Sequence, residues 1–114
     1  MPHLVIEYSA DIEEEVALPA LISAGHKAMV DSGLFNSNAI KSRAIPVQHY
    51  IAGEHDASFI HAEVRILDGR TSDQKRALSE QVFNALCRQA ETVPAVSVEV
   101  RDMERDCYSK RTAF

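Results

Sequence analysis

The start of the chain contains a residue whose backbone nitrogen, rather than a side chain, could act as a base. The sequence begins Met1-Pro2-His3, so removal of the first methionine would leave the ring nitrogen of Pro2 as a free secondary amine. A free α-amino group has a pKa near 8, about two units below that of lysine, and burial or a neighbouring cation lowers it further. A general base works best with a pKa near the working pH. Pro2 is therefore a candidate catalytic base.

A purely structural explanation of Pro2 stands beside the catalytic one. Small second residues, proline among them, permit methionine removal. A proline at the first position of a strand also costs little, because its missing N–H need not join the hydrogen-bond ladder. Pro2 taken alone does not decide between the two explanations, so the rest of the chain has to.

Three cationic side chains could hold an anionic substrate beside such a base. Arg70 lies in a predicted strand-to-helix loop, next to a helix N-terminus, where anions bind readily. An arginine can also bind a carboxylate through two parallel hydrogen bonds. Lys41 and Arg43 share one face of a predicted strand and could bind a second carboxylate. Each of the three could equally be a surface or ion-paired residue. Their coincidence with Pro2 favours a site for a small anion.

The other reactive side chains predict neither a metal site nor a cofactor. No two of the five histidines have the i, i+4 spacing of helical metal ligands. Cys87 and Cys107 are far apart and show no metal-binding spacing, which favours free thiols in a reducing cytoplasm. The sequence contains no Gly-rich phosphate loop and no nucleophile elbow.

Composition limits the class of protein. A chain of 114 residues with 46% hydrophobic and 25% charged residues is typical of one soluble globular domain, here residues 1–114. A net charge of −5 argues against nucleic acid as a partner. No apolar run approaches the roughly 20 residues of a membrane helix, and no signal-peptide pattern opens the chain. We expect a cytoplasmic protein with no membrane partner.

Hydrophobic periodicity predicts the elements that must position these residues. Alternating apolar and β-branched residues indicate strands at residues 3–9, 39–47, 58–67 and 96–103. A first helix should start at Leu18 or Pro19 and end at Gly33, with Leu21, Ile22, Met29 and Val30 as its apolar stripe. A second helix should follow a capping box at Thr71-Ser72-Asp73-Gln74 and run to about Ala90.

The order of these elements is strand-helix-strand, taken twice, with pseudo-repeats at about residues 2–50 and 58–103 and a polar tail at 104–114. Two βαβ units predict an α+β fold in which two parallel strand pairs form one four-stranded mixed sheet, with both helices on one face. The opposite face is mostly polar and could meet water. It could also be the inner wall of an oligomer, which fits the first strand better because that strand is apolar on both faces.

Five segments of the chain carry a family resemblance. They are residues 2–9 (Pro-His-Leu-Val-Ile-Glu-Tyr-Ser), 33–35 (Gly-Leu-Phe), 40–43 (Ile-Lys-Ser-Arg), 53–61 (Gly-Glu-His-Asp-Ala-Ser-Phe-Ile-His) and 69–71 (Gly-Arg-Thr). In combination they resemble the 5-carboxymethyl-2-hydroxymuconate isomerase family of the tautomerase superfamily. The resemblance extends over most of the chain, to about residue 103.

This resemblance implies a tautomerase-like homotrimer whose sheets surround a central channel, with active sites near the subunit boundaries. It implies cofactor-free ketonisation of a small anionic dienol from aromatic-compound degradation, in which a proton moves from the 2-hydroxyl oxygen to carbon 5. By the same implication Pro2 is the base and proton shuttle, and arginines bind the substrate carboxylates and polarise the carbonyl. Arg70 is then a second catalytic residue, and Lys41 and Arg43 are substrate-binding residues. Lys41 stands where the family has an arginine, so the charge is kept and the planar fork is lost.

Other functions remain open at this point. The chain could be a tautomerase of another enol acid such as phenylpyruvate. It could be a non-catalytic trimeric binding protein with the same fold, or a monomeric ferredoxin-like binding module. A free Pro2 nitrogen with a lowered pKa separates the enzymes from the binding proteins.

Overall fold

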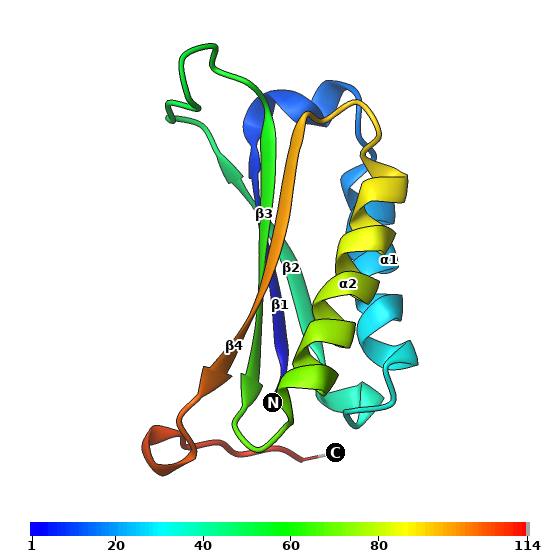
Figure 1. Ribbon diagram of the computed structural model, residues 1–114, viewed down its shortest axis with the longest axis vertical. Helices are drawn as coiled ribbons and strands as arrows, with labels where there is room; N and C mark the ends of the chain where they lie inside the picture. Colours follow the sequence, from blue (N-terminus) through cyan, green and yellow to red (C-terminus); the bar gives the residue numbers. More distant parts are fainter. Residues whose placement is uncertain (114) are drawn as a thin grey trace.

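One four-stranded sheet, covered on a single face by two helices, makes up the fold (Figure 1). The computed structural model describes residues 1–113, and Phe114, the last residue of the predicted tail, lies outside the described residues. The strands are β1 (His3–Ser9), β2 (Lys41–Val47), β3 (Phe59–Leu67) and β4 (Ala95–Met103), and the helices are α1 (Leu18–Asp31) and α2 (Ser72–Gln89).

The sheet has the order β2-β1-β3-β4 and mixes both kinds of pairing. β1 and β2 are parallel, β3 and β4 are parallel, and the central pair β1 and β3 is antiparallel. A parallel pair needs a crossover connection, here a helix, and the common right-handed crossover places both helices on the same side. The predicted architecture is confirmed. Pro46 lies in the edge strand β2, where its missing N–H costs least.

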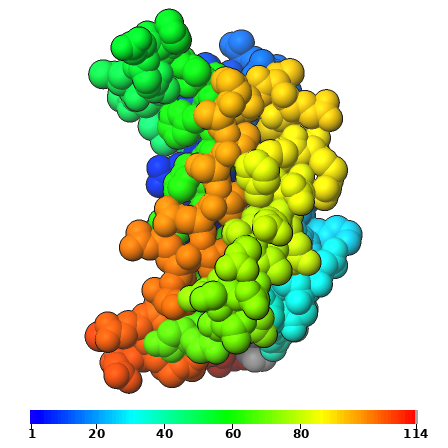
Figure 2. Space-filling view, viewed as in Figure 1, coloured from blue at the N-terminus to red at the C-terminus, as the bar shows by residue number. Residues whose placement is uncertain are grey.

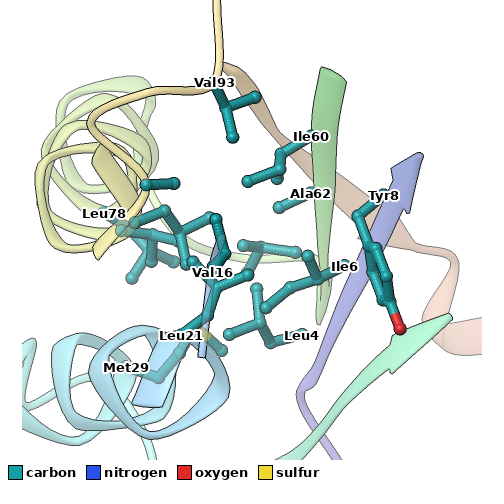
Figure 3. Packing of buried hydrophobic residues seen from close by; sticks show 14 of the residues in the cluster. Leu4, Ile6, Tyr8, Val16, Leu21, Met29, Ile60, Ala62, Leu78 and Val93 are labelled. Carbon is teal, nitrogen blue, oxygen red and sulfur yellow. The ribbon is translucent and has the colours of Figure 1, made fainter. Parts of the chain in front are cut away.

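The core lies between the sheet and the two helices, where side chains from both layers point toward one another (Figure 3). In β3, Ile60, Ala62, Val64 and Ile66 are buried while the residues between them are partly exposed, as the alternation predicted. The stripe of α1 is narrower than predicted. Leu21 and Met29 are fully buried, but Val30 is 37% exposed, because it borders a surface groove beside β2.

The predicted start of the second strand was wrong by two residues. Residues Ser37–Ala39 form a short 3₁₀ turn before β2 begins at Lys41. The Asn36 side chain caps this turn by accepting a hydrogen bond from the N–H of Asn38 at 3.0 Å. A local side-chain bond of this kind competes with strand pairing, which the apolar alternation alone does not reveal.

The helix boundaries confirm the capping predictions. Gln74 donates its N–H to the Thr71 hydroxyl at 3.1 Å, and the Gln74 side chain accepts from the Thr71 N–H at 2.9 Å. α1 begins at Leu18 with Pro19 in its first turn, and Gly33 follows it with φ of +71°. Within residues 1–113, no helix is long and apolar enough to cross a membrane.

The start of the chain and the described part of the tail lie at the same end of the sheet (Figure 1). β1 starts there, and the loop after β3 turns there into α2. The described tail, residues 104–113, runs across this end after a 3₁₀ turn at Arg105–Cys107, and in Figure 2 it forms the lower margin of the molecule. This arrangement brings the tail to the beginning of the chain.

Candidate active site

A hollow of about 200 Å³ opens where β1 begins. Four segments supply its walls: the chain start, the residues after α1, the loop after β3, and the tail. The lining residues are Met1, Pro2, Leu34, Phe35, Asn36, Ala39, Leu67, Arg70 and Lys110. Pro2 is buried, whereas Met1 is half-buried. The structure therefore brings together the predicted base and one predicted carboxylate-binding residue.

Strand pairing fixes Pro2 in this hollow. β1 is a central strand with β2 on one side and β3 on the other. The carbonyl of Pro2 accepts a hydrogen bond from the N–H of Lys41 at 3.0 Å, which extends the β1–β2 ladder back to residue 2. Pro2 lacks an N–H, so its own nitrogen is not committed to the ladder.

Arg70 reaches the hollow from the short loop between β3 and α2. Gly69 adopts a φ of +118°, a conformation that favours glycine, and Arg70 follows directly before the N-cap Thr71. The Arg70 guanidinium donates to the Leu34 carbonyl at 2.8 Å and to the Leu67 carbonyl at 3.4 Å. Arginine has five N–H donors, so these two contacts hold the group and leave donors for an anion.

The hollow lowers the basicity of the chain's amino terminus. Burial is the main cause of the lowered pKa of the Met1 amino group, followed by the charges of Lys110, Arg70, Lys41 and Arg105. Burial removes the hydration that stabilises an ammonium ion, and each cation repels it. The surroundings of the N-terminal nitrogen thus disfavour its protonated form.

Lys41 and Arg43 do not line this hollow. Both border a separate groove of about 650 Å³ between α1 and the edge strand β2. Arg43 contacts His3 on the neighbouring strand, with 3.1 Å between Arg43 Nη1 and His3 Nδ1. Burial, and then the charge of Arg43, lower the pKa of His3, which suits a neutral imidazole accepting this bond. Lys41 still influences the N-terminal amine through its charge. Its substrate-binding role, and that of Arg43, stay predictions.

Sequence reasoning missed Lys110. The tail was predicted only to be polar, and a run without periodicity gives no indication of what it packs against. Three basic residues, Arg105, Lys110 and Arg111, were the one available signal in it. Phe35 was noticed only within a family segment, and its ring proves to lie under the Arg70 guanidinium, 5.1 Å from ring centre to guanidinium carbon.

Comparison with known proteins identifies the family of the chain. The family model described as 5-carboxymethyl-2-hydroxymuconate isomerase matches residues 2–114. A 5-carboxymethyl-2-hydroxymuconate Delta-isomerase of Escherichia coli is 28% identical over 88 residues, covering 75% of this chain and 70% of that protein.

Solved structures share the fold. A 5-carboxymethyl-2-hydroxymuconate isomerase from Deinococcus radiodurans R1 superposes with a TM-score of 0.86 at 21% identity, covering 98% of this chain and 90% of its own. A Q0 fused 4-OT wild type symmetric trimer gives a TM-score of 0.80 at 19% identity, with 98% and 94% covered. Since the family match leaves out only the first residue, this chain belongs to the 5-carboxymethyl-2-hydroxymuconate isomerase family of the tautomerase superfamily.

Proposed function

We propose that the chain, once Met1 is removed, is a cofactor-free isomerase that converts 5-carboxymethyl-2-hydroxymuconate or a similar anionic dienol to its keto isomer. Pro2 is the base. The observation that carries this proposal is the burial of Pro2 in a hollow whose wall also includes Arg70 and Lys110. One small site thus contains a base, the burial and cations that lower the pKa of an amine, and an arginine that can bind a carboxylate.

The reaction moves one proton and two pairs of π electrons. The unprotonated Pro2 nitrogen takes the proton from the 2-hydroxyl oxygen, and the oxygen's electron pair forms the C2 carbonyl. The diene shifts to a single C3–C4 double bond conjugated with that carbonyl, and carbon 5 takes the proton back from Pro2. The amine returns to its starting state, so no metal, oxidant or second substrate is consumed. Negative charge develops on the oxygen, and a cation nearby stabilises it.

The electrostatics of the hollow support Pro2 as the base. Methionine removal shifts the free nitrogen by one residue, from half-buried Met1 to buried Pro2. Burial and the charges of Lys110 and Arg70, which lower the pKa of the Met1 amino group, therefore act on the Pro2 amine too. A lowered pKa leaves more of the amine unprotonated at neutral pH, as a general base requires.

A homotrimer is part of the same proposal. Among residues 1–113, no layer covers the sheet face that points away from the helices (Figure 1). On that face like charges are direct register partners, Glu63 with Glu99 and Arg65 with Arg101. The repulsion between these like charges is reduced by ion pairs within each strand. Arg65 pairs with Glu63 in β3 at 2.6 Å, and Arg101 lies 3.7 Å from Glu99 in β4. Solvent or a neighbouring subunit must complete this surface, and the fused 4-OT trimer has the same fold.

The test compares the processed protein with one whose Pro2 nitrogen is blocked. One extra alanine before Pro2 turns the amine into an amide and leaves the rest of the chain unchanged. Mass spectrometry verifies each N-terminus, circular dichroism the fold, and light scattering the mass. We expect turnover of 5-carboxymethyl-2-hydroxymuconate by the blocked form to fall at least about a hundredfold, the usual contribution of a general base. Equal rates for the two forms would remove Pro2 as the base. A processed protein active on phenylpyruvate alone would move the function to that enol acid.

A further inference from the structure

The tail contributes a cation to the hollow that the family segments of the sequence did not predict. Lys110 is an exposed residue that lines the hollow beside Pro2. Among the charged groups that lower the pKa of the N-terminal amine, Lys110 has the largest effect, ahead of Arg70. Its place in the lining and its electrostatic influence both put Lys110 beside the N-terminal amine.

The tail is hydrogen-bonded to the loop that contains Arg70. Arg105 donates its backbone N–H to Asp68 Oδ2 at 3.3 Å and its Nε to Asp68 Oδ1 at 3.2 Å, and its Nη2 donates to the Asp68 carbonyl at 2.8 Å. Three bonds to one residue define the direction in which the tail leaves β4. Asp68 is two residues from Arg70, so one loop positions both cations.

A second contact near the chain start depends on Met1. The Tyr108 hydroxyl lies 3.5 Å from the Met1 carbonyl, and this carbonyl leaves with Met1 when the chain is processed. The three bonds between Arg105 and Asp68 do not involve Met1, so they remain. They are therefore contacts of the tail that the processed protein keeps.

Arg70 and Lys110 are held in different ways. Arg70 is fixed by two carbonyls and by the Phe35 ring. Within residues 1–113, no side chain or backbone group binds the Lys110 ammonium through a hydrogen bond or an ion pair. A fixed planar guanidinium suits the carboxylate next to the reacting carbons, and an ammonium on a flexible stem can follow a second carboxylate at the other end of a substrate.

We propose that Lys110 is a substrate-binding residue that recognises a second carboxylate, so that the tail selects substrates with more than one acid group. Arg105 and Asp68 are the positioning residues for Lys110. This proposal rests on the proposed function, and it goes further by assigning the tail a part in the choice of substrate.

Two inert six-carbon dienes provide a binding test that needs no turnover. Muconate carries a carboxylate at each end, and sorbate carries only one. Isothermal titration of the processed protein with each gives the preference for the diacid. We expect Lys110→Ala to weaken muconate binding about fivefold and to leave sorbate within about twofold, in line with one partly exposed ion pair. Lys110→Arg should restore most of the loss.

The control is Arg111→Ala, which removes the same charge from the adjacent exposed residue of the tail without touching the hollow. Muconate binding to this variant should match that of the wild type. If Lys110→Ala and Arg111→Ala weakened muconate binding equally, the tail would attract the diacid only through its overall positive charge, and Lys110 would not be a binding residue. No change in either variant would overturn the proposal.

A double-variant comparison tests the positioning residues. Arg105→Ala should weaken muconate binding in the wild type and should have no further effect once Lys110 is alanine, because the tail then has no cation lining the hollow for Arg105 to position. Additive losses would show that Arg105 acts by another route. Steady-state kinetics on 5-carboxymethyl-2-hydroxymuconate should place the loss in KM. Muconate selectivity through Lys110 in a protein that does not turn over would contradict the proposed reaction while leaving the tail's role standing.

Discussion

The Arg70 guanidinium stacks on the Phe35 ring, with the guanidinium carbon 5.1 Å from the ring centre. The two residues come from different βαβ units, Phe35 from the segment after α1 and Arg70 from the loop after β3. Their contact joins the two halves of the chain at the wall of the hollow. It also adds a cation–π contact to the two carbonyl hydrogen bonds that hold the Arg70 guanidinium.

Replacing Arg70 with alanine should reduce kcat/KM on 5-carboxymethyl-2-hydroxymuconate by roughly tenfold or more. A hydrogen bond to a charged group contributes about 1.5–3 kcal/mol, which the variant loses. Steady-state kinetics measures the effect. Arg76→Ala is the control, since Arg76 lies on the exposed side of α2 and pairs with Asp73. If the two variants had the same kcat/KM, Arg70 would not bind the substrate and would be an ordinary surface residue.

Replacing Phe35 with leucine should have a smaller effect of the same kind. The variant keeps an apolar wall but loses the stacking, which is worth about 0.5–1 kcal/mol at a partly exposed site, or two- to fivefold in binding. We expect KM to rise while the thermal midpoint changes little. A loss in Phe35→Leu that persists in full when Arg70 is already alanine would show that the ring acts independently of Arg70.

The pH dependence of kcat/KM should report the Pro2 amine. Activity requires the unprotonated amine, so kcat/KM should fall as the pH drops through its pKa. Burial, Lys110 and Arg70 lower the pKa of the Met1 amino group, and we expect them to act in the same direction on the Pro2 amine, so this fall should lie below pH 8. Removing a cation eases protonation, so Lys110→Ala should shift the fall to higher pH. A fall at the same pH in wild type, Lys110→Ala and Arg70→Ala would contradict the assignment.

Replacing Gly25 with alanine tests how tightly α1 packs on β1. A Cβ at Gly25 would lie 2.7 Å from Leu4 Cδ2 and 3.2 Å from Leu86 Cδ2, and both leucines are fully buried. Overpacking costs about 1–3 kcal/mol, against a gain of about 0.5–1 kcal/mol from alanine's better helix propensity. We expect a lower free energy of unfolding in urea. Leu4→Val removes the colliding methyl group, so the same change in that background should be much less harmful.

The hydrogen bond of Tyr8 should contribute stability that depends on pH. The Tyr8 hydroxyl donates to Glu13 Oε1 at 2.6 Å, and this bond, with burial and the Glu13 charge, raises the pKa of Tyr8 to about 12. Tyr8→Phe should lower the free energy of unfolding by about 0.5–1 kcal/mol near neutral pH. A pKa raised in the folded state means that this contribution is present below pH 10 and is lost as the pH rises toward 12. Urea unfolding at several pH values measures it, and a constant difference across that range would contradict it.

The sequence predicted most of the fold because the relevant signals are local. Alternating apolar residues gave the four strands, and the Thr71–Gln74 capping box gave the start of α2. The 3₁₀ turn at Ser37–Ala39 was missed because the hydrogen bond that the Asn36 side chain accepts from the Asn38 N–H outweighed the strand pattern there. Pro2 was identified as a candidate because its chemistry depends only on its position next to Met1.

Tertiary structure decided which cations surround Pro2. Sequence spacing treated Lys41 and Arg43 alike as partners of the site, but strand order puts both beside the groove between β2 and α1. Lys110 lines the hollow, and the tail that carries it is hydrogen-bonded through Arg105 to Asp68, a contact between residues 37 positions apart. The family of the chain could be predicted from short segments. The charges around its amine depend on long-range packing, which no local pattern encodes, because a residue in an exposed tail carries no periodicity that indicates its neighbours.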